Sequence, residues 1–295
     1  MRLFQLCLFA VLTCLTTLAA YAGPPELLLD VARFRNLDKV KKGAVVEIYV
    51  TVPTQPLTYR QRAPRMFQSA ATVTMEVLDG QGKSAYRETI TLKPPVLSDT
   101  TISLKNPQSF LKRVYLPDGT YTLRGTVRDL YRKENGETVV ERPLVLGASE
   151  KGAYLSDIVL LSRPAAKSYG DDNFHRGGFE LTRAAGGFYG RGAETIYFYT
   201  EVHQAKPGET LRLHYHLEAP DGSAADADAQ LTTQEGKPTT VVGQLPMGPL
   251  PDGPLKLTIT AYGGAGGKQK LTTQTVTAQR NQTEFAPTGA ALPRE

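Results

Sequence analysis

The chain has 295 residues, of which 41% are hydrophobic and 21% are charged, and its formal net charge is +5. Residues 23–148 carry 19 Lys/Arg against 13 Asp/Glu, whereas residues 149–280 carry 13 against 14, so the basic excess belongs to the first half. This excess suits an acidic partner or an anionic surface, and the lack of a Lys/Arg stripe with interleaved aromatic residues argues against a nucleic-acid-binding protein.

Residues 1–22 have the features of a secretory signal peptide. A positively charged start precedes an apolar stretch over residues 3–18 and an A-Y-A cleavage site at residues 20–22. We expect cleavage at this site and export to the periplasm or the cell surface, with an uncleaved anchor and a lipoprotein at Cys14 as alternatives. Since Cys7 and Cys14 are the two cysteines, the exported part would have no disulfide, thiolate metal site or cysteine nucleophile. No later apolar run reaches membrane-spanning length.

Alternation of apolar and polar residues predicts about seven β-strands in residues 23–148. Turn signals separate them, such as DGQG at residues 79–82 and NG at residues 135–136. The expected strands cover residues 27–34, 45–52, 71–78, 84–92, 111–115, 121–128 and 138–146. Seven short strands in about 120 residues are typical of an antiparallel Ig-like β-sandwich.

The second half repeats this plan. The expected strands cover residues 158–161, 195–202, 210–218, 230–233, 239–242, 255–262 and 270–278. The phrase LPDG followed by an alternating strand occurs at residues 116–127 and again at residues 250–261, once in each half. The predicted fold class is therefore all-β, with two tandem Ig-like antiparallel β-sandwiches. These are a first domain at residues 23–148 and a second at 149–280, and a disordered tail is expected at 281–295.

The repeated LPDG is interpreted as structural. Proline fixes φ and Asp-Gly accepts positive φ, so the phrase predicts a tight turn. Tyr121, directly behind the first copy, is expected to form a tyrosine corner in which its hydroxyl bonds back to the backbone, whereas Leu255 takes that place in the second copy.

Five segments carry a resemblance to a known family. They are VVEIYVTVPTQPLTYR (45–60), ATVTMEVLDGQGK (71–83), LPDGTYTLRGTVRD (116–129), LSDIVLL (155–161) and IYFYTEV (196–202). These segments resemble the N-terminal region of secreted GWxTD-domain proteins of Bacteroidota, which implies an envelope location and tandem sandwiches, and no activity. The Gly-Trp-x-Thr-Asp motif is absent because the chain has no tryptophan, so nothing about that later domain carries over. Residues 206–222 are similar to the sandwich modules of macroglobulin-like proteins, which are structural.

His214 and His216 are the strongest candidate site residues, because an i, i+2 pair on a strand points both imidazoles to one face. If residues 195–203 pair with residues 209–218 across the KPGE turn, further ring side chains join that outer face. These side chains are Tyr197, Tyr199 and His203.

The resulting histidine–tyrosine face is a hypothesis for a partner or ligand surface. A metal is a minor alternative, because Arg212 is a poor neighbour for a cation and the sequence shows no convergent carboxylate cluster. An ordinary solvated sheet face is the simpler interpretation.

Two further segments carry charged or catalytic residue types. Arg60, Arg62 and Arg65 lie in one loop and suit bidentate contacts with phosphate or carboxylate, although a solvated loop explains them as well. The glycine-rich residues 170–192 contain Asp171, Asp172 and His175, but no phosphate-loop or nucleophile-elbow spacing accompanies them, so we interpret this segment as an excursion between strands.

Taken together, these features predict a non-enzymatic exported envelope protein that acts as a structural or protein-interaction module. The alternative is a ligand-binding protein, for a small molecule, glycan or metal, that uses the outer histidine–tyrosine face. We expect no catalytic residues, no cofactor and no bound metal. The expected partner is another envelope protein, with no nucleic acid and no transmembrane segment after signal cleavage.

Overall fold

The computed structural model describes residues 23–35, 43–101, 106–134, 136–147, 152–170, 174–287 and 290–291. These residues form an all-β protein whose helical turns are two short 3-10 helices, Ala185–Gly187 and Ala265–Gly267. Neither is long or apolar enough to cross a bilayer, and no other helix occurs in the described part of the chain. The predicted signal peptide at residues 1–22 and the domain boundary expected between residues 148 and 149 lie outside the described residues.

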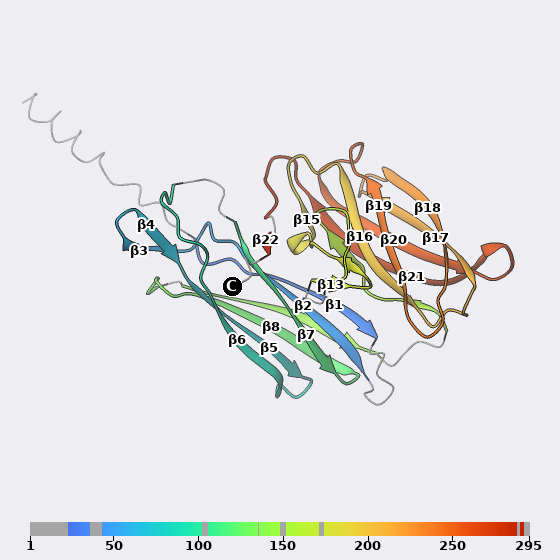
Figure 1. The fold of residues 1–295 in the computed structure, drawn as a ribbon, viewed down its shortest axis with the longest axis horizontal. Helices are drawn as coiled ribbons and strands as arrows, with labels where there is room; N and C mark the ends of the chain where they lie inside the picture. Colours follow the sequence, from blue (N-terminus) through green and yellow to red (C-terminus); the bar gives the residue numbers. More distant parts are fainter. Residues whose placement is uncertain are drawn as a thin grey trace, which may run out of the picture.

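Residues 23–147, called the first half here, contribute two antiparallel sheets to one core (Figure 1). One sheet has the order β1-β2-β7 and the other has the order β6-β5-β8-β9. The strands are β1 (Leu28–Arg35), β2 (Ala44–Val52), β5 (Ala71–Asp79), β6 (Ser84–Leu92), β7 (Gln108–Leu116), β8 (Gly119–Asp129) and β9 (Glu137–Leu146). Alternate side chains of both sheets, such as Ile48, Val73 and Leu123, are fully buried in this core. Apolar alternation thus supplies the burial that stabilises both sheets.

Residues 152–287, called the second half, also contribute two sheets to one core. One sheet is centred on β16, which pairs with β10, β11 and β19, and the other has the order β15-β21-β20-β17-β18. The strands are β10 (Tyr154–Leu155), β11 (Val159–Leu161), β15 (Phe188–Tyr189), β16 (Thr195–His203), β17 (Thr210–Glu218), β18 (Ala224–Thr232), β19 (Thr239–Pro246), β20 (Gly253–Gly263) and β21 (Gln269–Arg280). Phe198 and Tyr215 of the two sheets meet edge to face, with ring centroids 4.9 Å apart.

The LPDG turns occupy equivalent places in the two halves. The first precedes β8, an inner strand of the four-stranded sheet β6-β5-β8-β9, and the second precedes β20, an inner strand of the five-stranded sheet. The tyrosine corner predicted for the first copy is confirmed, because the hydroxyl of Tyr121 donates to the carbonyl of Pro117 over 3.1 Å.

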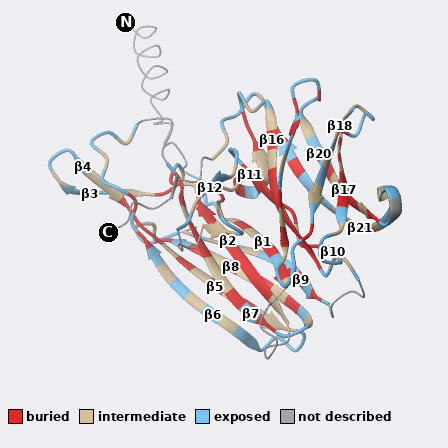
Figure 2. Cartoon of the chain, turned by 45° about the vertical axis from the view of Figure 1, so that its right-hand side comes forward, coloured by how far each residue is buried: buried red, intermediate tan, exposed pale blue. Residues whose placement is uncertain are grey.

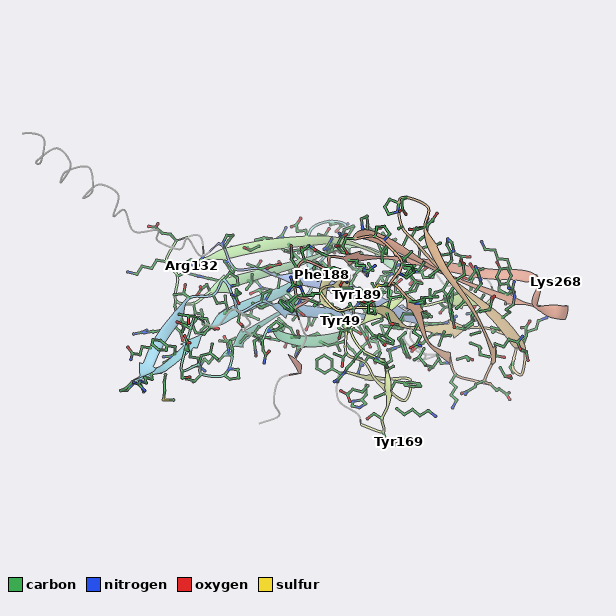
Figure 3. All side chains as sticks on the ribbon, turned by 90° about the horizontal axis from the view of Figure 1, so that it is seen from above. Tyr49, Arg132, Tyr169, Phe188, Tyr189 and Lys268 are labelled. Carbon is green, nitrogen blue, oxygen red and sulfur yellow. The ribbon has the colours of Figure 1, made fainter. Side chains whose placement is uncertain are left out.

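A third hydrophobic cluster joins the two halves. It packs Phe34, Tyr49 and Leu111 of the first half against Leu161 and Tyr199 of the second. Figure 3 shows Tyr49 near the middle of the long axis, between Arg132 at one end and Lys268 at the other. The outward faces of β2 and β16 are therefore covered at the centre of the molecule, which Figure 2 shows as burial along both strands.

The strand pairing expected across the KPGE turn is wrong. β16 pairs with β19 over residues 195–202, whereas β17 pairs with β18 and β20. The chain instead crosses from one sheet to the other after His203, through Gln204 with φ of 55°. Period-two alternation predicts which face of a strand is buried, but it does not predict which strand lies beside it. Because β16 and β17 lie in facing sheets, the apolar faces of both strands are buried in the core between them.

Two other expectations are corrected. The predicted loop around Arg62 is an antiparallel hairpin of β3 (Tyr59–Ala63) and β4 (Met66–Ser69). Residues 281–287, expected in a disordered tail, instead follow β21 with ordered contacts: the Thr283 amide donates to the Asn281 side chain, and the Arg191 amide donates to the Glu284 carbonyl. β22 (Ala290–Ala291) then pairs with β7. Polar residues at this end find backbone partners that sequence composition does not reveal.

Candidate functional site

The central strands β2 and β16 place similar side chains on the two sides of the contact between the halves. Glu47 and Tyr49 alternate on β2, and Tyr199 and Glu201 alternate on β16, so each strand presents a carboxylate and a phenol to the other half. Glu47 is 1% exposed and Glu201 is 4% exposed. Carboxylates buried to this extent need charged or hydrogen-bonding partners.

A single guanidinium connects these carboxylates. Arg176, on β13 (His175–Arg176), places its Nη1 3.0 Å from Glu47 Oε1 and meets both oxygens of Glu201, with Nε–Oε1 and Nη2–Oε2 distances of 2.7 and 3.2 Å. Arg113 adds a second cation, with its Nε 2.8 Å from Glu47 Oε1. His203 Nε2 lies 3.0 Å from Glu201 Oε2. We call these five residues the inter-half ion network.

Aromatic rings close this network on its apolar side. The hydroxyls of Tyr49 and Tyr199 donate to Glu47 and Glu201, the latter over 2.8 Å. The Arg176 guanidinium lies 3.5 Å from the centre of the Phe34 ring. Every oxygen of the two carboxylates thus has a hydrogen-bonded or charged partner, and the cation also stacks on a ring.

The pKa of Glu201 reflects these partners. Burial acts to raise the pKa, but the bond to His203 and the charge of Arg176 outweigh it and lower the pKa of Glu201 to about 2. Burial and the neighbouring carboxylates raise the pKa of both Tyr49 and Tyr199 well above the usual value. Near pH 7, Glu201 is therefore ionised and the phenols of Tyr49 and Tyr199 are neutral.

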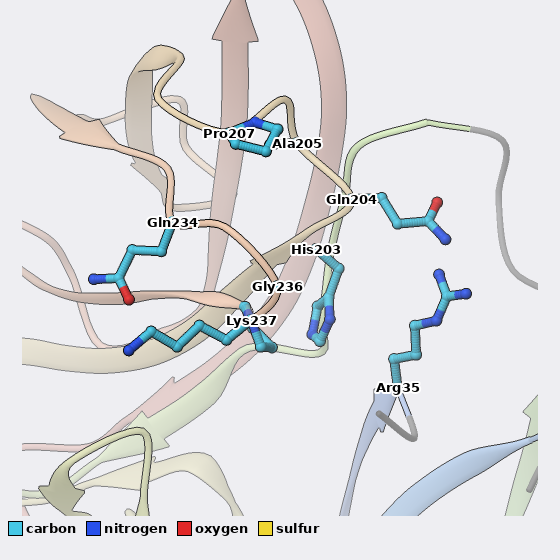
Figure 4. Close-up of a pocket in the computed structure, with 9 residues that line it drawn as sticks. Arg35, His203, Gln204, Ala205, Pro207, Gln234, Gly236 and Lys237 are labelled. Carbon is cyan, nitrogen blue, oxygen red and sulfur yellow. The ribbon is translucent and has the colours of Figure 1, made fainter. Parts of the chain in front are cut away.

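A pocket of about 240 Å³ opens beside His203 (Figure 4). Arg35 at the end of β1 and Gln204 after β16 both line it, and their side-chain ends point toward each other in the close-up. Gln234 and Lys237 add further polar side chains to the lining. The Tyr154 ring stacks on the His203 imidazole at 5.0 Å, so this histidine forms part of a packed wall.

The structure separates the histidine–tyrosine face expected from the sequence. Tyr199 and His203 are buried at 0% and 3% exposure, and Tyr197 is partly buried beside them at the contact between the halves. His214 and His216 lie on the other sheet, on the outward face of β17, where alternation predicted them. The prediction of one shared face is therefore wrong, while the outward direction of the two β17 histidines is confirmed.

The two β17 histidines face carboxylates that the sequence interpretation missed. In the β17–β18 register His214 lies opposite Asp228, and His216 lies opposite Asp226. His216 Nδ1 is 2.8 Å from Asp226 Oδ1, and His214 Nε2 is 3.2 Å from the same oxygen. The sequence Asp-Ala-Asp at residues 226–228 does alternate in step with β17. It was not predicted as a strand because alanine and aspartate are depleted in strands.

The three arginines of the β3–β4 hairpin are all exposed. Arg62 places its guanidinium 5.3 Å from the centre of the Tyr131 ring and donates to that hydroxyl. Arg65 sits at the tip with φ of 56°, beside Met66, which is 45% exposed. The hairpin thus carries the exposed side chains of Arg60, Arg65 and Met66.

The glycine-rich excursion covers the contact between the halves. Its small sheet joins β12 (Ala166–Lys167), β13 and β14 (Phe179–Glu180). His175 contacts the hydroxyl of Ser168, while Asp171 and Asp172 lie outside the described residues. The residue of this segment with the clearest role is Arg176, which the sequence interpretation did not single out.

No known family and no curated protein matches the chain. Solved structures with some similarity include a transglutaminase from red sea bream, at 11% identity over 86% of this chain and 31% of that chain, with a TM-score of 0.27. A β-glucuronidase from Bacteroides uniformis is 10% identical over 81% and 26%, with a TM-score of 0.31. A tetra-tandem repeat from the extending region of a large adhesion protein is 15% identical over 88% and 50%, with a TM-score of 0.25. The chain spans half or less of the length of each of these proteins.

Proposed function

We propose that this chain is an exported, non-enzymatic structural or protein-interaction module, made of two tandem Ig-like β-sandwiches held in one fixed arrangement. The signal peptide predicted at residues 1–22 supports export to the periplasm or the cell surface. The resemblance to the N-terminal region of secreted GWxTD-domain proteins supports the same location.

The strand order supports the Ig-like part of the proposal. In the first half, three strands pair in one sheet and four in the other. In the second half, β16 with its partners corresponds to the smaller sheet, and β18, β17, β20 and β21 correspond to the larger one. Two facing antiparallel sheets of about seven strands in total are the pattern of an Ig-like domain.

The inter-half ion network is the observation that carries the proposal. Arg176 of the second half meets Glu47 of the first over 3.0 Å, so separation of the halves would break this buried ion pair. The aromatic cluster beside it adds apolar contact that also opposes opening. A protein fixed in this way holds its outer surfaces at a constant separation, which suits a structural spacer or a module to which other proteins bind.

The β3–β4 hairpin supports the interaction part of the proposal. It exposes Arg60, Arg65 and Met66, so one hairpin combines positive charge with an apolar side chain. Such a surface fits a partner with an acidic patch around an apolar pocket.

The proposal is tested in a bacterial host that expresses the full chain with a photo-crosslinking residue at Met66. We expect a processed protein that begins at Gly23, found in the envelope fraction and crosslinked to an envelope protein. The same residue at Val139, which is 52% exposed on β9, serves as the position control and should give no such product.

Charge variants make this test specific. Arg60→Glu/Arg65→Glu is expected to lower the crosslink yield at Met66 by at least about tenfold. Lys83→Glu/Arg142→Glu changes the net charge equally on other exposed positions of the first half and should leave the yield unchanged. A full-length protein retained in the cytoplasm contradicts export, and a yield equal in both double variants contradicts the hairpin surface.

Ligand binding remains the second candidate function. The pocket beside His203 and the histidine–aspartate contacts on β17 and β18 are the observations that favour it. Because the tyrosines lie elsewhere, the histidines of this candidate belong to the outward face of β17 and β18 rather than to a histidine–tyrosine face, and the pocket beside His203 is a separate place.

A further inference from the structure

Three potential metal ligands converge on the outward face of β17 and β18. One nitrogen of His214, one of His216 and one carboxylate oxygen of Asp226 all lie within 4.8 Å of one another. The distances from Asp226 Oδ1 are 3.2 Å to His214 Nε2 and 2.8 Å to His216 Nδ1. The two imidazole rings are nearly parallel, with an angle of 20° between them and centroids 6.3 Å apart.

These distances fit a tetrahedral zinc-class site. Zinc binds imidazole nitrogen and carboxylate oxygen at about 2.0–2.2 Å, so ligand atoms of one tetrahedral ion lie about 3.3 Å apart. Asp226 already meets both imidazoles near that separation. The histidine side chains are 33% and 34% exposed, which leaves them room to rotate toward a common ion and leaves a further position open to water.

The strands fix this donor set. Residues two apart on β17 point to the same face, and antiparallel pairing sets His216 directly opposite Asp226. On the other side of β17, Thr258 and Thr260 of β20 lie opposite the two histidines and add no charge.

The cations near the cluster pair with carboxylates other than Asp226, so Asp226 pairs with the two imidazoles. Arg212 is 3.1 Å from Asp228, which also contacts His214 at 3.3 Å, and Lys256 is 3.0 Å from Glu218, which lies 3.9 Å from His216. Within the described part of the chain, both ion pairs of Asp226 are with His214 and His216. The two nearby cations are thus each paired with a different carboxylate, which reduces their repulsion of a bound cation.

We infer that His214, His216 and Asp226 form a binding site for one divalent transition-metal ion of the zinc class. The site has two nitrogen ligands and one oxygen ligand from the protein, and its open position faces solvent. It is independent of the inter-half ion network and of the hairpin surface.

The site is tested by competition between the metal-free full chain and a chromophoric chelator for Zn²⁺. We expect one equivalent of Zn²⁺ that is lost in His214→Ala/His216→Ala. His175→Ala should still bind one equivalent of Zn²⁺, because His175 lies on β13, which belongs to a different sheet from β17 and β18. Cys7, Cys14 and His203 are present in every variant, so any binding by them cancels in the comparison.

Two aspartate variants separate a coordinated ion from general attraction to an acidic face. Asp226→Asn is expected to weaken Zn²⁺ binding by at least about tenfold, whereas Asp228→Asn, with the same change in charge on the same strand, should change it by less than about threefold. Zn²⁺ should also raise the unfolding temperature of the unmodified chain but not of the double histidine variant.

The outcomes that overturn the inference are distinct. A chain that takes no Zn²⁺ from the chelator has no such site. Equal loss in Asp226→Asn and Asp228→Asn shows diffuse attraction instead of coordination. Unchanged binding in His214→Ala/His216→Ala places the ion elsewhere. Because all these side chains are partly or fully exposed, circular dichroism should show the variants folded, and a comparison of folded variants decides the question.

Discussion

At the residue scale, Glu201 shows how a nearly buried carboxylate remains charged. Its oxygens meet Arg176, His203 and the Tyr199 hydroxyl. These interactions favour the carboxylate form more strongly than burial opposes it, so the pKa of the folded protein lies far below the ordinary value of 4.5. The difference between the two values links folding to pH.

The sign of this linkage follows from the lowered pKa. Above about pH 5.5 the carboxyl is ionised in both folded and unfolded chains, and its stabilising contribution is fully present. As pH falls from 4.5 toward 2, the unfolded chain takes up the proton first, so the free energy of unfolding decreases, by about 3 kcal/mol in total for a pKa that moves from 4.5 to about 2.

The variant Glu201→Gln is expected to lose this pH-dependent part. Its free energy of unfolding should lie below that of the parent chain at pH 7, and the difference should shrink as pH falls from 5 to 2.5. Urea unfolding at several pH values measures this, with the exposed Glu137→Gln as control. A constant difference between parent and Glu201→Gln over that pH range would show that the pKa of Glu201 is not lowered.

Residue-level predictions from the sequence succeeded where local pattern decides. The outward direction of His214 and His216 follows from the apolar side chains that alternate with them, Leu213, Tyr215 and Leu217. The bond of Tyr121 follows from its place after the LPDG turn. The burial of Tyr199 and His203 did not follow, because alternation marks one apolar face of β16 but does not show that the other half covers its polar face.

At the element scale, strand positions were more predictable than strand partners. The strands expected at residues 45–52, 71–78 and 84–92 agree with β2, β5 and β6 within one residue at each end. The choice of a neighbouring strand depends on contacts across the whole core. The sequence around β16 therefore does not show that β19, rather than β17, pairs with it. The start of β18 at Ala224 was missed because its alanines and aspartates have low strand propensity.

The pairing of β16 with β19 depends on a glycine. Gly243 lies opposite Phe198 in the register, and a Cβ added at Gly243 would lie 2.2 Å from the Phe198 ring. Phe198 is fully buried and packs against Tyr215, so the ring has little room to withdraw. Because Gly243 has no side chain, the Phe198 ring can lie against the backbone of β19.

Gly243→Ala is expected to destabilise the protein by about 1–3 kcal/mol, through displacement of a packed ring. Gly80→Ala is the control, since the nearest atom to its added Cβ lies 3.8 Å away, and should cost less than about 0.5 kcal/mol. Phe198→Leu should couple with Gly243→Ala, so that the double variant is more stable than the sum of the single effects predicts. Additive effects in urea unfolding would mean that the ring is not the obstacle.

At the scale of the whole molecule, the inter-half ion network determines how the two halves sit together. An apolar contact alone permits several nearby orientations, whereas Arg176 reaches Glu47 and Glu201 together in a narrow range of geometries. We therefore interpret the buried charges as a device for a specific arrangement more than as a source of stability, since the desolvation of three ions offsets much of their attraction.

Arg176→Met separates these two roles. It removes the pair with Glu47 that crosses between the halves and leaves Glu201 nearly buried without its cation, at a total cost of about 3–5 kcal/mol. Each half keeps its own hydrophobic core. We therefore expect the halves to separate, which small-angle scattering should detect as a larger radius of gyration and thermal unfolding as two transitions in place of one.

Two comparison variants identify the cause. Arg163→Met removes the exposed Arg163–Glu180 pair of the same excursion, with side chains 62% and 41% exposed, and should cost less than about 1 kcal/mol without change in shape. Glu47→Gln/Arg176→Met/Glu201→Gln removes the shared cation together with both carboxylates, while Arg113, whose side chain is 28% exposed, keeps its bond to the His175 carbonyl. No buried carboxylate is then left without its cation, so the contact should re-form, with most of the lost stability recovered. If the triple variant scatters like Arg176→Met, packing by Arg176 rather than its charge holds the halves together. If Arg176→Met scatters like the parent chain, the apolar cluster alone is sufficient.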